Sequence, residues 1–135
     1  MIRYHIFLVE DDVYFDFFYK TELLNYFFTD YMAEPNREDL KKQFNYITCP
    51  IPHEEFDHTE QNVYLSERII TVFSNQPLIM DNHFLAQLEK LDRHCFIVDH
   101  SNNKYGWLTP KKNQLNWSNP AEHFAINQLY NQSIN

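Results

Sequence analysis

Two apolar runs in the second half of the chain predict the centre of the fold. The runs Cys95–Val98 and Tyr105–Leu108 flank a polar stretch, Asp99–Lys104. Short runs rich in β-branched and aromatic residues, separated by turn-forming residues, are typical of a β-hairpin. Cys95–Val98 has no polar–apolar alternation, which indicates a strand covered on both faces and therefore central in its sheet. Asn102 and Asn103 tolerate left-handed backbone and suit the turn.

The N-terminal part of the chain predicts a strand followed by a long helical region. Residues 2–9 form the strand, and residues 10–34 the helical region, with a break near Tyr19–Thr21. Three carboxylates at its start, in residues 10–12, favour a helix N-terminus. Apolar residues then recur at helical spacing, which predicts a buried stripe. The stripe consists of Leu24, Phe27, Phe28 and Tyr31.

Residues 36–52 predict a second helix that stops early. Asn36 is a plausible N-cap, and Leu40, Gln43 and Phe44 lie along one side. We expect this helix to end before Tyr46, because the prolines at positions 50 and 52 favour extended backbone in the residues that precede them. The acidic, histidine-bearing residues 53–62 predict an exposed loop.

The remaining pattern predicts a hairpin and a further helix before the central hairpin. Val63–Leu65 and Ile69–Phe73 flank a short polar turn, as paired strands do. A helix begins at Asp81 or Asn82, and its apolar side contains Phe84, Leu85, Leu88 and Leu91.

Strands and helices mix without strict alternation, which favours a single α+β domain with a mainly antiparallel sheet and helices packed on it. We assign residues 1–110 to this domain, since Pro110 ends the last predicted strand. Residues 111–135 are expected to form a C-terminal extension. A peripheral helix is predicted there, from Ser118 or Asn119 to about Tyr130.

The start of the first helical region is too apolar for an ordinary surface helix. Within residues 13–19 only Asp16 is polar, and the others are valine or aromatic. Such a helix is either deeply buried or presents one face to a partner. Because a small core can rarely cover all sides of a helix near a chain terminus, we keep both interpretations open.

Composition and charge exclude several classes of function. The 135 residues include a single glycine, Gly106, so glycine-rich phosphate-binding loops are absent. The net charge of −8 disfavours direct binding of nucleic acid, whose phosphates attract clustered Lys and Arg. No apolar run reaches the roughly 20 residues that span a bilayer, and none resembles a signal peptide. We expect a cytoplasmic protein without membrane contact.

The candidate chemical groups do not compose a catalytic or metal site. Cys49, His53 and His58 are irregularly spaced, whereas zinc sites usually include a closely spaced ligand pair. Cys95 beside His94 lies in a predicted central strand, where a thiol behaves as a small apolar group. We therefore expect no enzyme, no metal and no cofactor.

Two further polar groups are interpreted as solvated. The acidic residues among 54–60 lack the glycine and the ligand alternation of a calcium loop. Asp99 and His100 lie next to each other at the turn of the central hairpin, where adjacent side chains rarely orient each other. We expect the acidic run and the pair Asp99 and His100 to face water.

Several segments together resemble a known family. The segment from Phe7 to Lys20 runs on to Thr29-Asp30-Tyr31. Lys42-Gln43 is followed by the string Tyr46-Ile47-Thr48-x-Pro50-Ile51-Pro52. Cys95-Phe96 is followed by Tyr105-Gly106-Trp107-Leu108-x-Pro110. With these strings in this order, the chain resembles the sporulation inhibitor of replication (SirA) family of Bacillus-type spore formers.

The resemblance implies a non-enzymatic protein that binds the N-terminal domain of the replication initiator DnaA and inhibits replication during sporulation. It also implies a monomer that forms a heterodimer through its first two helices. Gln43 matches the family in residue type, while Val13 and Phe17 stand where the family has a larger aromatic residue and a tyrosine. The expected partner-binding residues are Val13, Tyr14, Asp16, Phe17, Lys20 and Gln43. The alternative is an interaction module or homodimer that uses the same aromatic surface for another partner.

Overall fold

A computed structural model describes residues 1–56, 62–78, 82–109 and 114–118. Its helices are α1 (Asp11–Phe17), α2 (Thr21–Ala33), α3 (Glu38–Ile47), the 3-10 helix η1 (His53–Glu55) and α4 (Asn82–Lys90). Its strands are β1 (Ile2–Val9), β2 (Val63–Leu65), β3 (Ile70–Ser74), β4 (His94–Asp99), β5 (Lys104–Thr109) and β6 (Gln114–Ser118).

The strands form one six-stranded sheet in the order β2-β3-β1-β4-β5-β6. Each neighbouring pair is antiparallel, so the predicted α+β class is confirmed. β4 lies between β1 and β5, as its uninterrupted apolar run predicts. The predicted hairpin of β2 and β3 is also confirmed.

No strand was predicted for residues 114–118, where β6 pairs with β5 and continues the sheet. The helix predicted to end near Tyr130 lies outside the described residues.

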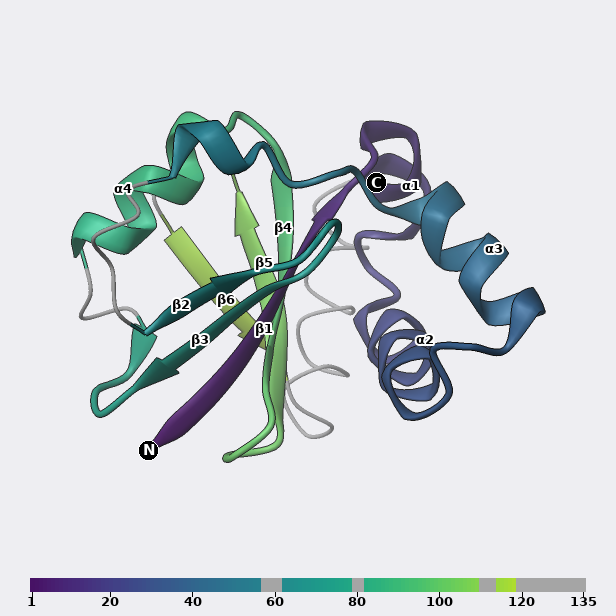
Figure 1. Ribbon diagram of the computed structural model, residues 1–135, viewed down its shortest axis with the longest axis horizontal. Coiled ribbons are helices and arrows are strands. Elements are labelled where there is room, and N and C mark those ends of the chain that lie inside the picture. The colour runs from purple at the N-terminus through teal and green to yellow at the C-terminus, as the bar shows by residue number, and fades with distance from the viewer. Residues whose placement is uncertain (57–61, 79–81, 110–113, 119–135) are drawn as a thin grey trace, which may run out of the picture.

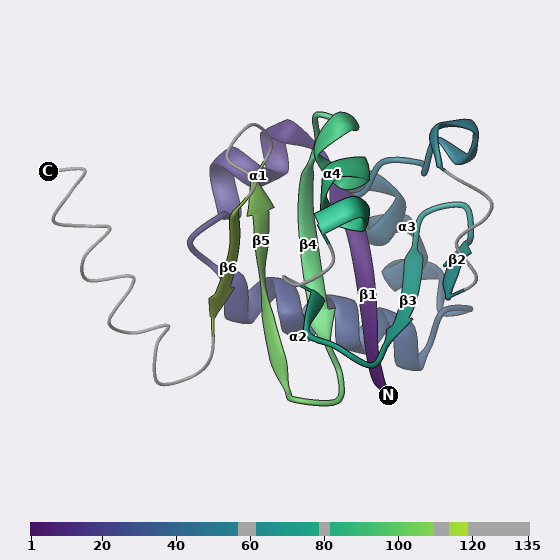
Figure 2. The ribbon, with the colours of Figure 1, turned by 90° about the vertical axis from the view of Figure 1, so that its left-hand side faces the viewer.

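The helices cover the two faces of the sheet unequally. α1, α2 and α3 lie on one face and α4 lies on the other (Figures 1 and 2). Successive side chains of a strand point to opposite faces, so β1 contributes to both layers. Ile6 and Leu8 pack in the cluster that contains α4, whereas Phe7 and Val9 pack in the cluster below α1–α3.

The predicted break in the first helical region is confirmed. α1 ends at Phe17, and α2 begins at Thr21. The indole Nε1 of Trp107 on β5 donates a hydrogen bond to the carbonyl oxygen of Phe18 at 2.9 Å. This bond satisfies a carbonyl at the end of α1 and attaches the break to the sheet.

The predicted early end of the second helix is wrong. α3 continues through Tyr46 to Ile47. Its N-cap is Arg37 and not the predicted Asn36, and the Arg37 side chain makes no capping hydrogen bond. Proline restricts mainly the residue that precedes it, so Pro50 constrains Cys49 and leaves the end of α3 free. Ile47 is buried, which favours its place on the helix.

The segment after α3 extends the sheet. Thr48 forms an antiparallel bridge with Val9, and the Cys49 amide donates to the Leu8 carbonyl oxygen at 2.7 Å. These contacts anchor the end of α3 to the end of β1, next to the start of α1.

The prediction that Asp99 and His100 face water is wrong. Asp99 is only 3% exposed, and its carboxylate accepts hydrogen bonds from the backbone amides of Ser101 and Asn102. A short carboxylate can satisfy the amides of the turn that it begins, and this interaction explains its burial. Asn103, with φ of 53°, supplies the left-handed residue that the turn needs.

His100 is half-buried against a second histidine. Its Nε2 lies 2.6 Å from Nδ1 of His5, which is 8% exposed on β1. Burial, followed by the nearby charges of His100 and Arg3, lowers the pKa of His5 to about 4. Burial and Arg3 also lower the pKa of His100, while Asp99 opposes this shift. The fold therefore favours two neutral imidazoles.

The predicted loop over residues 53–62 is only partly exposed. Residues 53–55 form η1 and face water, but Phe56 is buried against the sheet in the cluster that contains α4. Residues 57–61 lie outside the described part of the chain. The helix predicted near residue 82 is confirmed as α4, with Phe84, Leu85 and Leu88 buried.

Replacement of Phe28 by alanine should destabilise the domain by about 3–5 kcal/mol, because the ring is fully buried and would leave a cavity. Phe15→Ala is the matched control, since Phe15 is 66% exposed and its loss should change stability by less than about 1 kcal/mol. Urea denaturation measures both values. Similar losses for the two variants would contradict this description of the core.

The histidine pair should make the domain less stable in acid. The unfolded His5 binds a proton near pH 6.5, whereas the folded one does so only near pH 4. Stability should therefore fall as the pH decreases between these values, by about 1–2 kcal/mol from pH 7 to pH 5. Denaturation at both pH values tests this, with His5→Gln as the comparison. An unchanged pH dependence in that variant would show that the pair is not responsible.

Candidate functional site

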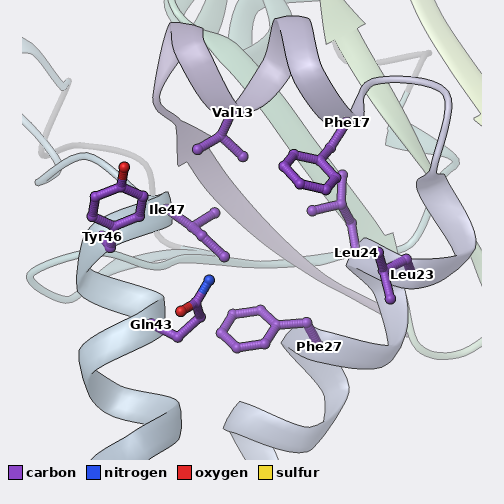
Figure 3. Close-up of a pocket in the computed structure, with 8 residues that line it drawn as sticks. All are labelled: Val13, Phe17, Leu23, Leu24, Phe27, Gln43, Tyr46 and Ile47. Carbon is purple, nitrogen blue, oxygen red and sulfur yellow. The ribbon is translucent and has the colours of Figure 1, made fainter.

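An apolar groove lies on the helical layer, between α1, α2 and α3. It has a volume of about 230 Å³, and Figure 3 shows the eight side chains that line it. They are Val13 and Phe17 of α1, Leu23, Leu24 and Phe27 of α2, and Gln43, Tyr46 and Ile47 of α3.

Helical spacing brings these side chains to one place. Val13 and Phe17 are four residues apart on α1. Gln43 and Ile47 are also four apart on α3, with Tyr46 between them. Residues separated by three or four positions share one side of a helix, so each helix presents a row of side chains to the groove.

The groove has a buried floor and an exposed rim. Val13, Leu24 and Ile47 are less than a tenth exposed and belong to the core below the helices. Leu23 and Tyr46 are 54% and 75% exposed, so their apolar surface meets water in the free protein. Covering them with a partner would recover hydrophobic free energy, about 25 cal/mol for each Å² of apolar surface.

The lining chemistry suits binding better than catalysis. Gln43 supplies an amide and Tyr46 a hydroxyl, and the other six residues are apolar. No carboxylate, imidazole or thiol lines the groove. General acid–base or nucleophilic chemistry needs such groups within hydrogen-bond reach of a substrate, so this groove can hold apolar side chains and orient a few polar ones.

Aromatic rings hold the walls of the groove in place. Phe28 of α2 stacks on Phe7 of β1, with ring centroids 4.1 Å apart. Phe44 of α3 meets Phe7 edge-on at 5.9 Å and also stacks with Tyr31 of α2 at 3.9 Å. The two helices are therefore fixed both to the sheet and to each other.

No charged side chain lines the groove. Asp11, Asp12 and Asp16 of α1 are exposed. Lys20 is also exposed, and its Nζ lies 5.4 Å from the centre of the Phe17 ring, in reach of a cation–π interaction.

The structure brings three of the six predicted binding residues together. Val13, Phe17 and Gln43 line the groove. Tyr14 points away from it and stacks on His94 at 3.5 Å. Asp16 lies outside the lining, and Lys20 lies beside Phe17 as described above.

Five groove residues were missing from the predicted binding set. Leu24 and Phe27 were assigned to the buried stripe of the helix, although Phe27 is only half-buried. Tyr46 and Ile47 were missed because their helix was expected to end too early. Leu23 had no signal beyond its place next to Leu24 in an amphipathic helix.

The apolar start of the helical region is partly covered. Phe15 and Tyr19 remain 66% and 41% exposed, whereas Val13 is buried and Phe17 is half-buried at the groove. Residues 13–19 therefore fit neither a deeply buried helix nor a helix with one fully exposed apolar face.

The two thiols are buried and free of disulfides. Burial is the main cause that raises the pKa of Cys49 to about 11 and that of Cys95 to about 12. Both therefore stay protonated at neutral pH, and neither is an activated nucleophile. Within the described residues, no cluster of three or more His, Cys, Asp or Glu side chains could hold a metal ion. His58 lies outside these residues.

The fold and groove define an α+β domain with an apolar recess on its helical layer. Residues 3–65 match the family model of the sporulation inhibitor of replication protein SirA. This match confirms the resemblance to the SirA family over β1, α1, α2, α3 and β2. No curated protein matches the chain. None of the described helices is long and apolar enough to cross a membrane.

Stability measurements should separate the floor of the groove from its rim. Leu24→Ala should cost about 2–5 kcal/mol, because Leu24 is 4% exposed and packs in the core. Tyr46→Ala should change stability by less than about 0.5 kcal/mol, because most of that side chain is in water. Chemical denaturation compares them. A large loss from Tyr46→Ala would mean that the rim serves folding and is not free for a partner.

Proposed function

We propose that this protein is a non-enzymatic, cytoplasmic inhibitor of DNA replication initiation that acts during sporulation. It binds the N-terminal domain of the initiator DnaA through the groove between α1, α2 and α3. The inhibition is steric: the bound domain can no longer assemble at the origin or meet its usual partners.

The observation that carries the proposal is the position of the groove within the family match. Its eight lining residues fall between Val13 and Ile47, and the SirA match covers residues 3–65. The part of the chain that resembles a replication inhibitor therefore also contains an apolar surface suited to a protein partner.

The lining supports a binding mode with a few central anchors. A partner side chain in the groove would contact the half-buried rings of Phe17 and Phe27 above the aliphatic floor. A handful of such buried contacts usually supplies most of the affinity of an interface. The Gln43 amide can donate and accept hydrogen bonds with polar groups of the partner, which fixes orientation.

The charge of the protein favours a basic partner surface. The whole chain carries −8, and the exposed acidic side chains Asp11, Asp12 and Asp16 lie on α1. Complementary charges speed encounter and weaken as salt screens them. We therefore expect the association rate with the DnaA domain to fall as the salt concentration rises.

Replacement of Phe17 by alanine should weaken binding to the isolated N-terminal domain of DnaA by about 10–100-fold, which corresponds to the loss of a buried aromatic anchor. Phe15→Ala is the matched control. Phe15 is also a phenylalanine of α1, but it is more exposed and lies outside the groove. Its replacement should leave the affinity nearly unchanged. Titration calorimetry measures both affinities.

Two results would contradict the proposal. Equal affinity of Phe17→Ala and the unchanged protein would remove the groove from the interface. A larger loss from Phe15→Ala would place the interface on the other side of α1. A thermal denaturation of each variant shows that the fold is retained before the affinities are compared.

A further inference from the structure

One wall of the groove depends on the last turn of α3. Gln43, Tyr46 and Ile47 line the groove, and α3 ends at Ile47. The last carbonyl groups of a helix have no partner within it, so a helix end frays unless other groups bind them. The shape of this wall therefore depends on the contacts that hold the end of α3.

α3 has no basic residue at the end where a helix gains most from one. A positive charge near the last turn complements the partial negative charge of the terminal carbonyl groups. None of the residues in the last turn of α3 is basic. The Thr48 hydroxyl donates to the Phe44 carbonyl oxygen at 2.7 Å, and the Glu10 amide donates to the Ile47 carbonyl oxygen at 2.9 Å, but both donors are neutral groups. A compensating charge has to come from another segment.

Arg68, in the turn between β2 and β3, supplies that charge. Its Nη1 donates hydrogen bonds to the carbonyl oxygens of Thr48 at 2.6 Å and of Asn45 at 3.3 Å. The Arg68 side chain is 19% exposed, so these charge-assisted bonds are partly shielded from water. The carboxylate of Glu67 competes only weakly for the guanidinium, because it lies 4.0 Å away on a side chain that is 84% exposed.

The turn between β2 and β3 is itself held in place. Nε2 of His53 lies 2.8 Å from the Ser66 carbonyl oxygen, and the Ile51 amide donates to the Glu67 carbonyl oxygen at 2.8 Å. Ile69 packs against the cluster below α1–α3. Figure 1 shows this turn reaching toward the helical layer. A side chain on such a supported turn can hold the end of a helix in one position.

We propose that Arg68 is a positioning residue for the groove: it holds the last turn of α3, and with it the wall that α3 forms, in the arrangement that a partner meets. Arg68 does not line the groove, and it lies beyond residues 3–65 of the family match. The positioning itself needs no partner. Its effect on binding rests on the function proposed above.

Amide hydrogen exchange of the full-length protein tests the positioning without a partner. In Arg68→Ala, exchange should accelerate about five- to ten-fold at the amides of residues 46–48, because the last turn of α3 opens more often. It should stay unchanged at the amides of α4 and β4. Arg37→Ala is the matched control, because it removes an exposed arginine from the other end of α3 and should leave residues 46–48 unchanged.

A conservative variant separates positioning from a general loss of stability. Arg68→Lys keeps the positive charge but loses the guanidinium geometry, so exchange at residues 46–48 should lie between the rates of Arg68→Ala and the unchanged protein. Equal exchange at these residues in Arg68→Ala and the unchanged protein would overturn the proposal. An acceleration spread evenly over α3, α4 and β4 would also overturn it, since Arg68 would then support only the fold as a whole.

Binding of the DnaA domain separates this inference from the proposed function. Arg68→Ala should weaken that binding about three- to ten-fold, because the partner would have to order the last turn of α3, whereas Arg37→Ala should not. Unchanged affinity of Arg68→Ala, despite faster exchange, would overturn the dependence of the groove on this residue. If exchange accelerates at residues 46–48 but the domain binds not even the unchanged protein, the positioning stands and the DnaA proposal fails.

Discussion

The stack of Phe28 on Phe7 is the contact on which the helical layer depends. The two rings lie nearly parallel, at 7°, with centroids 4.1 Å apart and no exposure to water. Phe44 and Phe96 close the cluster from α3 and β4. Because one ring of β1 contacts both α2 and α3, the position of each helix is set by the same strand, and the space between them is set too.

The groove is the outer side of this arrangement. Its floor, formed by Val13, Leu24 and Ile47, belongs to the same cluster as the stacked rings. A partner would therefore meet walls that are already in place, which reduces the ordering cost of binding. The exposure of Leu23 and Tyr46 to water is unfavourable in the free protein, and a partner that covered them would relieve it.

Periodicity in the sequence was sufficient to predict most of the fold. The central β4 and the buried residues of α4 follow from the apolar pattern, and the break between α1 and α2 was also predicted. The errors came from interactions that spacing does not encode. The end of α3 depends on Ile47 reaching the core, and the burial of Asp99 on backbone amides that only the folded turn presents. The groove combines residues of three helices. The family resemblance implied Val13, Phe17 and Gln43, whereas periodicity assigned Phe27 to a buried stripe and Tyr46 was expected to lie beyond the end of its helix.

The groove between α1, α2 and α3 is the surface that we propose binds the N-terminal domain of DnaA. Chemical-shift mapping of the isotopically labelled protein during titration with that domain tests it most directly. We expect the largest shifts at Phe17, Phe27, Gln43 and Tyr46, with little change at Tyr64 on β2 or in α4. Shifts confined to β2, β3 or α4, or none at a saturating concentration of the domain, would contradict it.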